Sequence, residues 1–124
     1  ELDAEGVVPS SLEARCKEAR LEGRPAKALY VIPTGQNPTG CEMSAERARE
    51  VYRVAREQDL LIIEDDAYYF LRHGDGEAPV LQSTTLAALD EDARVVRLDS
   101  FSKVMAAGFR LGWITAHKDL GRAY

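Results

Sequence analysis

Short apolar runs alternate with amphipathic stretches along the chain. Residues 28–32 (Ala-Leu-Tyr-Val-Ile) and 60–63 (Leu-Leu-Ile-Ile) are continuous apolar runs, which are typical of strands that are buried on both faces. Residues 95–98 predict a third strand, and residues 111–115 predict a fourth. The pattern therefore predicts four short strands.

Two helices are predicted, one before the first strand and one between the first strand and the second. Ser10 and Ser11 can cap a helix that extends to about Leu21, where a Gly and a Pro follow. Ser44 is a good cap for the second helix. Apolar residues in that helix recur at i, i+3, i+4 and i+7, which predicts one buried stripe, formed by Ala48, Val51, Tyr52 and Ala55.

The order of these elements predicts the fold class. After the second strand come a polar loop at residues 72–77 and a short helix near residues 85–89. Strands that alternate with helices build a mainly parallel sheet wrapped by helices, so the class is α/β. The connection from the third strand to the fourth is shorter than the dozen or so residues that a parallel crossover needs. We therefore expect the strand at 111–115 to run antiparallel.

Composition and charge exclude several classes of protein. The 124 residues include 16 basic and 21 acidic ones, and the scattered Lys and Arg argue against a nucleic-acid partner. The longest aliphatic run has only four residues, whereas a membrane-spanning helix needs roughly 20, so no membrane partner is expected. Cys16 and Cys41 show no disulfide or zinc-ligand spacing, which fits a cytoplasmic setting. Because the chain starts at Glu1, we expect it to be a piece of a longer protein.

Polar residues that could bind a ligand or take part in catalysis follow three of the predicted strands. Asn37 follows the first strand within a Pro- and Gly-rich turn, Asp65 follows the second, and Ser100 and Lys103 follow the third. Each alone has an ordinary structural explanation, as part of a turn, a helix cap or a surface lysine. Because the carboxyl ends of parallel strands meet at one sheet edge, where ligands bind, their joint placement predicts a ligand site.

Two other kinds of site are disfavoured. Gly35 and Gly40 have the spacing of a phosphate-binding P-loop, but a Cys-Glu pair follows where Lys-Ser/Thr is required. Asp65 and Asp66 could ligate a metal, yet adjacent strand residues point to opposite faces. The acidic residues 90–92 are typical of a polar loop, so no metal site is predicted.

Four motifs, in this order, carry a resemblance to a known family over nearly the whole chain. They are Asn37-Pro38-Thr39-Gly40, Asp65-Asp66-Ala67-Tyr68, Ser100-Phe101-Ser102-Lys103, and Arg110 seven residues later. The series resembles the fold-type I pyridoxal-phosphate aminotransferases of class I/II. Gln36 and the doubled tyrosine Tyr68-Tyr69 look most like the aromatic and 2-aminoadipate/kynurenine branch. The resemblance implies that residues 1–124 are the central part of the cofactor-binding large domain, without its N-terminal segment and the C-terminal small domain.

The resemblance implies pyridoxal 5′-phosphate as the cofactor and gives each motif a role. Lys103 would hold the cofactor aldehyde as a Schiff base, the internal aldimine, and would act as the general base. Asp65 would keep the pyridine nitrogen protonated, whereas Asp66 faces away. Asn37 and Tyr68 would donate to the phenolic oxygen, and Tyr68 counts with Lys103 and Asp65 as catalytic. The residues that would bind the phosphate are Ser100, Ser102 and Arg110.

The resemblance also implies an activity. It is that of a cytoplasmic, homodimeric enzyme of amino acid metabolism, which transfers an amino group between an aromatic or 2-aminoadipate-like amino acid and a 2-oxo acid such as 2-oxoglutarate. The segment alone is expected to be inactive, because the family's residues for the substrate carboxylate and for stacking on the cofactor ring lie outside it. Two alternatives stay open. One is the pyridoxal-phosphate-sensing domain of a transcription regulator, which would follow a basic helix-turn-helix domain. The other is a carbon–sulfur lyase, which Lys103 and Asp65 would serve equally.

Overall fold

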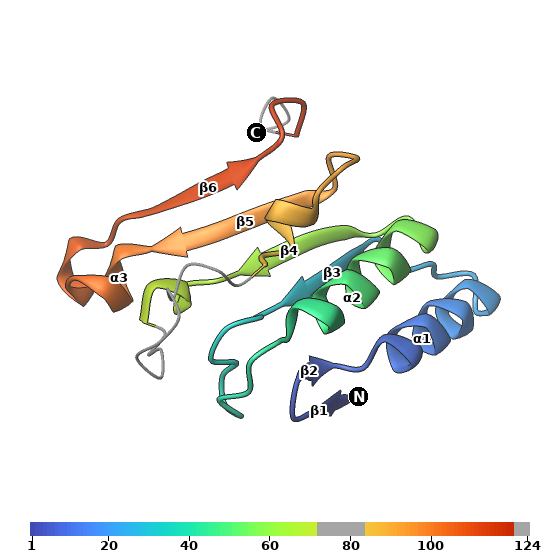
Figure 1. Cartoon of the computed structure of the whole chain (residues 1–124). Helices are drawn as coiled ribbons and strands as arrows, with labels where there is room; N and C mark the ends of the chain where they lie inside the picture. The colour runs from blue at the N-terminus through green and yellow to red at the C-terminus, as the bar shows by residue number, and fades with distance from the viewer. Residues whose placement is uncertain (72–83, 121–124) are drawn as a thin grey trace.

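The computed structural model describes residues 1–71 and 84–120, so the polar loop predicted at 72–77 lies outside the described residues. Its elements run along the chain as Figure 1 shows. They are β1 (Leu2–Asp3), β2 (Gly6–Val7), α1 (Pro9–Leu21), β3 (Ala28–Val31), α2 (Ala45–Glu57), β4 (Leu61–Asp65), η1 (Tyr69–Leu71), η3 (Ala87–Leu89), β5 (Val95–Ser100), α3 (Phe101–Val104), η4 (Ala107–Phe109) and β6 (Gly112–Ala116).

The main sheet has four strands in the order β3-β4-β5-β6. β3 pairs with β4 and β4 with β5 in parallel, whereas β5 and β6 are antiparallel. The α/β class and the antiparallel fourth strand are thereby confirmed. β4 and β5 each extend two residues beyond their predicted ends, so Asp65 and Ser100 are the last residues of their strands. Ladder pairing of Asp65 with Leu98 and of Ser100 with Gly112 keeps these polar residues in the sheet.

Helices α1 and α2 lie on one face of this sheet (Figure 1). The strand residues that face them are buried, such as Leu29 and Val31 in β3, whereas Tyr30 between them is 55% exposed. The prediction that this strand is buried on both faces is therefore wrong, because within the described residues helices cover only one face. The predicted stripe of α2 is confirmed as buried. The core residues are Cys16, Leu29, Val31, Met43, Ala48, Val51, Tyr52, Ala55, Leu60, Ile62, Leu86 and Val95.

The two long helices begin in different ways. Ser44 caps α2 as predicted, because its Oγ accepts a hydrogen bond of 3.2 Å from the Arg47 amide. α1 begins earlier than predicted, with Pro9 in its first turn and Val8 at the cap position without a side-chain cap. The predicted capping by Ser10 and Ser11 is wrong, since proline has the helical φ and lacks the N–H that a cap would satisfy. Among the described residues, no helix combines the length and apolarity needed to span a bilayer.

Gly112 lets β6 approach β5 closely. It pairs with Ser100, and a Cβ placed on it would lie 2.7 Å from the carbonyl oxygen of Asp99. That oxygen belongs to the backbone and cannot rotate away. Any side chain at this position therefore forces the two strands apart.

We expect Gly112→Ala to lower the free energy of unfolding of the full-length protein by about 1–3 kcal/mol, the usual cost of overpacking. Chemical denaturation measures the change. Gly108→Ala is the matched control, because no heavy atom lies within 4 Å of a Cβ at Gly108. Its effect should stay within about 0.5 kcal/mol. Equal stability of the two variants would contradict the close approach of the strands.

Candidate active site

The carboxyl ends of β3, β4 and β5 meet at one edge of the sheet, because these neighbouring strands are parallel. The loop at residues 33–40 follows β3, Tyr68 follows β4, and α3 follows β5. In Figure 1 these segments lie at the same end of the molecule. The topology thus brings Asn37, Asp65 and Lys103, which are far apart in the sequence, to one edge.

The loop at residues 33–40 is closed by its own hydrogen bonds. The side-chain Oε1 of Gln36 accepts hydrogen bonds from the backbone N–H of Thr39, at 3.1 Å, and from the Thr39 hydroxyl. The backbone N–H of Gln36 donates to the Cys41 carbonyl at 3.0 Å. Asn37, exposed at the tip, precedes a cis peptide bond to Pro38. Gln36 therefore shapes the loop that presents Asn37.

Tyr68 lies between this loop and α3. A Cβ placed on Gly35 would be 3.6 Å from the Cβ of Tyr68, so the loop packs against Tyr68. On the other side, Lys103 Nζ lies 5.6 Å from the centroid of the Tyr68 ring, within the range of cation–π contacts. The structure thus brings Tyr68 and Lys103 together and places the Asn37 loop beside them.

Asp65 lies on the sheet face that α2 does not cover. Its Oδ2 accepts a hydrogen bond of 2.5 Å from the hydroxyl of Tyr30 on β3. This hydrogen bond, with burial as the second cause, raises the pKa of Tyr30 to about 12. Sequence reasoning missed Tyr30, which looked like an ordinary strand residue. Its partner becomes visible only when the register between β3 and β4 is known.

Asp66 lies on the opposite face and is 1% exposed. One oxygen of Asp66 is 3.1 Å from the guanidinium of Arg97. Arg97 also donates two hydrogen bonds to Asp99, of 3.0 and 2.9 Å, and lies 4.5 Å from the Tyr69 ring centroid. The buried arginine therefore joins the end of β4 to β5 directly beneath the edge that carries the site.

Glu64 is a second buried carboxylate on this face. Its two oxygens accept hydrogen bonds of 2.8 and 2.9 Å from the amides of Leu86 and Ala87. Burial raises the pKa of Glu64, although these two amides act in the opposite direction. Glu64 therefore serves to fix η3 against the sheet. Within residues 1–71 and 84–120, no three His, Cys, Asp or Glu side chains are grouped so as to hold a metal ion.

The remaining candidate residues surround α3. Ser100 caps this helix, since its Oγ accepts a hydrogen bond of 3.1 Å from the Ser102 amide. The hydroxyl proton of Ser100 stays available for a ligand, because this bond uses only an oxygen lone pair. Arg110 is exposed at the end of η4 with a φ of 49°. Within the described part of the chain, no hydrogen bond or ion pair joins the Arg110 guanidinium to either serine.

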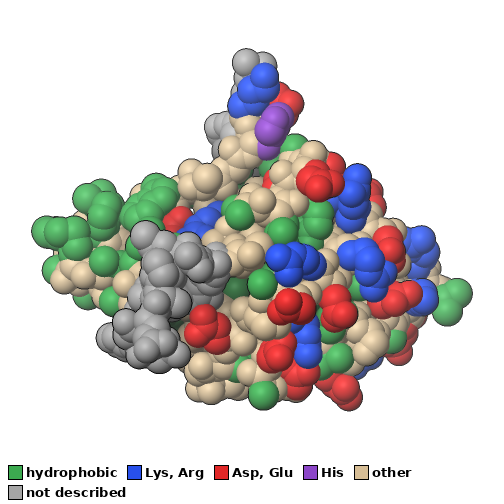
Figure 2. Space-filling view, in the orientation of Figure 1, with side chains coloured by type: hydrophobic (Ala, Val, Ile, Leu, Met, Phe, Trp, Pro, Cys, Tyr) green, Lys and Arg blue, Asp and Glu red, His purple; other side chains and the backbone are tan. Residues whose placement is uncertain are grey.

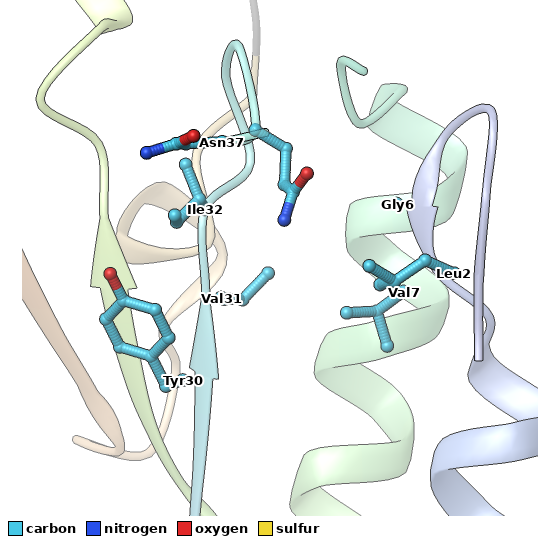
Figure 3. A pocket seen from close by; sticks show the side chains of 8 residues that line it. Leu2, Gly6, Val7, Tyr30, Val31, Ile32 and Asn37 are labelled. Atoms are coloured by element: carbon cyan, nitrogen blue, oxygen red, sulfur yellow. The ribbon is translucent and has the colours of Figure 1, made fainter. Parts of the chain in front are cut away.

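Apolar side chains gather on the surface at the α3 end of the molecule (Figure 2). Exposed apolar residues near α3 in the sequence include Met105 at 66% and Leu111 at 60%. A separate cavity of about 210 Å³ lies between the N-terminal hairpin and β3 (Figure 3). Its lining includes Tyr30, Gln36 and Asn37 but not Lys103, so the cavity adjoins the candidate site and is not centred on Lys103.

The chain matches the family model of aminotransferase class I and II over residues 8–124, and it belongs to this family. Pyridoxal phosphate is the cofactor of the family.

The chain is 44% identical, over 95% of its length, to the mitochondrial kynurenine/alpha-aminoadipate aminotransferase of Bos taurus. It is similar in structure to an archaeal alanine:glyoxylate aminotransferase, with a TM-score of 0.86 and 41% identity over 98% of the chain. It is also similar to the kynurenine aminotransferase of Pyrococcus horikoshii, solved with PMP, with a TM-score of 0.87 and 36% identity over 98% of the chain. The chain spans only 28% of the bovine relative and 29% of each of these two structures.

The bond between Tyr30 and Asp65 predicts an alkaline titration. Because it favours the neutral phenol, its contribution to stability is fully present below the ordinary pKa of 10.0 and is lost as the pH rises toward 12. We expect Tyr30 to stay protonated up to about pH 11 in the wild type, and to ionise nearer pH 10 in Asp65→Asn, where the negative charge is gone. The difference in tyrosinate absorbance with and without Tyr30→Phe, in both backgrounds, measures this. Identical titration in the two backgrounds would show that Asp65 does not hold Tyr30.

Proposed function

We propose that the full-length protein is a pyridoxal-phosphate-dependent aminotransferase. It would transfer an amino group between an aromatic or 2-aminoadipate-like amino acid and a 2-oxo acid such as 2-oxoglutarate. The observation that carries this is the convergence of Lys103, Tyr68 and Asp65 at one sheet edge in a chain of this family. The names of two relatives support the substrate class. One is the bovine kynurenine/alpha-aminoadipate aminotransferase, and the other, 46% identical, is an L-tyrosine:2-oxoglutarate aminotransferase of Tapinella panuoides.

The side chains at this edge fit pyridoxal phosphate in number and kind. Asp65 offers a carboxylate for the ring nitrogen, and Asn37 and Tyr68 offer an amide and a phenol for the phenolic oxygen. Lys103 offers the amine that holds the aldehyde carbon. Within the described residues, the side-chain amide of Asn37 makes no hydrogen bond to protein, so its N–H donors are free for a ligand. The phosphate would be held by Ser100, Ser102 and Arg110.

In this proposal the chain's own residues bind, orient and move a proton. When bound, the cofactor supplies an electron sink that stabilises negative charge at the substrate α-carbon. The Lys103 amine would act as the general base that moves the proton between that carbon and the aldehyde carbon of the cofactor. Tyr68, whose ring lies beside the amine, limits the positions that Lys103 can take. Asp65 keeps the proton on the ring nitrogen, which the electron sink requires.

We further propose that residues 1–124 form the central part of the large domain of a homodimeric enzyme. The chain covers only 24–28% of the length of its curated relatives, so turnover is assigned to the longer protein and the segment by itself is expected to be inactive. The predicted cytoplasmic location is not confirmed, since the bovine relative is named a mitochondrial enzyme. Amino-acid-dependent conversion of 2-oxoglutarate by the full-length protein tests the activity. It also separates an aminotransferase from a carbon–sulfur lyase or a cofactor-sensing regulator, neither of which needs this reaction.

The role of Lys103 predicts one site of covalent labelling. Incubation of the full-length protein with pyridoxal phosphate, followed by borohydride reduction and peptide mass spectrometry, should place a phosphopyridoxyl group on Lys103. Lys103→Ala should lose the label, because no other amine lies at this edge in the described residues. Lys17→Ala, which removes an exposed lysine paired with Glu13 on α1, should keep it. A reduced adduct on another lysine of the wild type would contradict the assignment.

The role of Asp65 predicts a separation of turnover from binding. Asp65→Asn should lower kcat roughly 100-fold or more, because a neutral amide does not keep the ring nitrogen protonated. Cofactor affinity should fall far less, since the phosphate and Lys103 contacts persist. Steady-state kinetics and a cofactor titration measure the two effects. Asp59→Asn is the control, because Asp59 is 94% exposed and precedes β4 at the opposite edge. Unchanged turnover in Asp65→Asn would refute the role.

A further inference from the structure

We propose that Tyr30 is a positioning residue for Asp65. Its hydroxyl holds Oδ2 of the carboxylate and leaves Oδ1 to accept from the ring nitrogen of the cofactor. This inference rests on the proposed function, because it concerns the carboxylate that serves the cofactor. Tyr30 itself would touch neither the substrate nor the reacting atoms.

The sheet register places Tyr30 where only a long side chain can reach Asp65. Tyr30 pairs with Ile63, and Asp65 lies two residues farther along β4, on the same face. Such diagonal neighbours are within reach of an aromatic side chain. In Figure 3 the Tyr30 ring extends from β3 toward the neighbouring strand, and the O–O distance to Asp65 is 2.5 Å. The hydroxyl therefore lies within hydrogen-bond distance of the carboxylate.

Within the described residues, core packing does not explain a tyrosine at this position. Tyr30 is 55% exposed, whereas Leu29 and Val31 on the other face are 9% and 4% exposed and form the core. An ordinary β-branched residue would serve the strand equally well. What a phenol adds is a donor, and with a pKa of about 12 the phenol of Tyr30 remains protonated at neutral pH. Asp65 thus has a permanent donor on one oxygen.

The donor is also neutral, and this suits a carboxylate that must bind a cation. Asp66 and Asp99, on the opposite face, are paired with the charged Arg97. Asp65 has no Lys or Arg in ion-pair distance among residues 1–71 and 84–120. A cationic partner would compete with the protonated ring nitrogen for the carboxylate, whereas a phenol orients it and leaves its charge.

A double-mutant cycle on the full-length protein tests the proposal. Tyr30→Phe should weaken pyridoxal phosphate binding about 10-fold, the effect of losing one hydrogen bond to a charged group. In the Asp65→Ala background the same substitution should change affinity less than about 2-fold, because the group through which Tyr30 acts is gone. A second readout is the ¹⁵N chemical shift of labelled pyridoxal phosphate. Tyr30→Phe should move the ring-nitrogen signal toward that of the unprotonated ring.

Tyr52→Phe is the matched control. Tyr52 donates a hydrogen bond of the same length, 2.5 Å, to Asp92, and its pKa is also raised to about 12, but it lies on α2 and packs in the core. Its loss should lower stability while cofactor affinity stays within about 2-fold and the ¹⁵N signal stays in place. Equal cofactor affinity and an unchanged signal in Tyr30→Phe, or a loss that persists in Asp65→Ala, would overturn the positioning role alone. A wild-type protein that binds no pyridoxal phosphate would overturn the proposed function together with it.

Discussion

The parallel, in-register pairing of β4 with both of its neighbours is the constraint on which the rest of the structure depends. It makes three carboxyl-terminal strand ends coincide, so that segments separated by 28 to 66 residues in the chain share one edge. The same pairing decides which face each side chain of β4 takes. Asp65 faces Tyr30 on the open side, whereas Glu64 and Asp66 face the helices. A slip of one residue would exchange these sets and place Asp65 in the core.

The carboxylates on the two faces of the sheet at this edge have different kinds of hydrogen-bond and ion-pair partners. On the helix face, buried carboxylates require charged or backbone donors, because an unpaired buried charge is costly. Arg97 forms ion pairs with Asp66 and Asp99, and backbone amides donate to both oxygens of Glu64. On the open face, Asp65 accepts a hydrogen bond from the neutral phenol of Tyr30. The buried arginine thus joins the ends of β4 and β5 on the face opposite Asp65.

Much of the fold, and which residues are candidates for the site, could be predicted from local patterns. The apolar runs, the α2 stripe and the Ser44 cap each depend on residues close in sequence, and each is confirmed. The errors arose where a distant or competing partner decides the outcome. Because of pairing with neighbouring strands, β4 and β5 extend through the polar residues at their carboxyl ends. α1 begins at Pro9, before the two serines that were predicted to cap it. Burial of β3 on both faces was inferred from apolar residues alone, which do not say what covers them.

The sequence by itself determined the α/β class, the family and the candidate residues, because motif order and apolar periodicity are properties of the chain. Only the tertiary structure decided which candidates lie together and what supports them. The contact of Lys103 with Tyr68, the packing of the Gly35 loop against Tyr68 and the bond from Tyr30 to Asp65 all join different strands or loops. Contacts of this kind depend on strand register and facing. These are set by pairing and burial across the whole sheet, and no short stretch of sequence contains them.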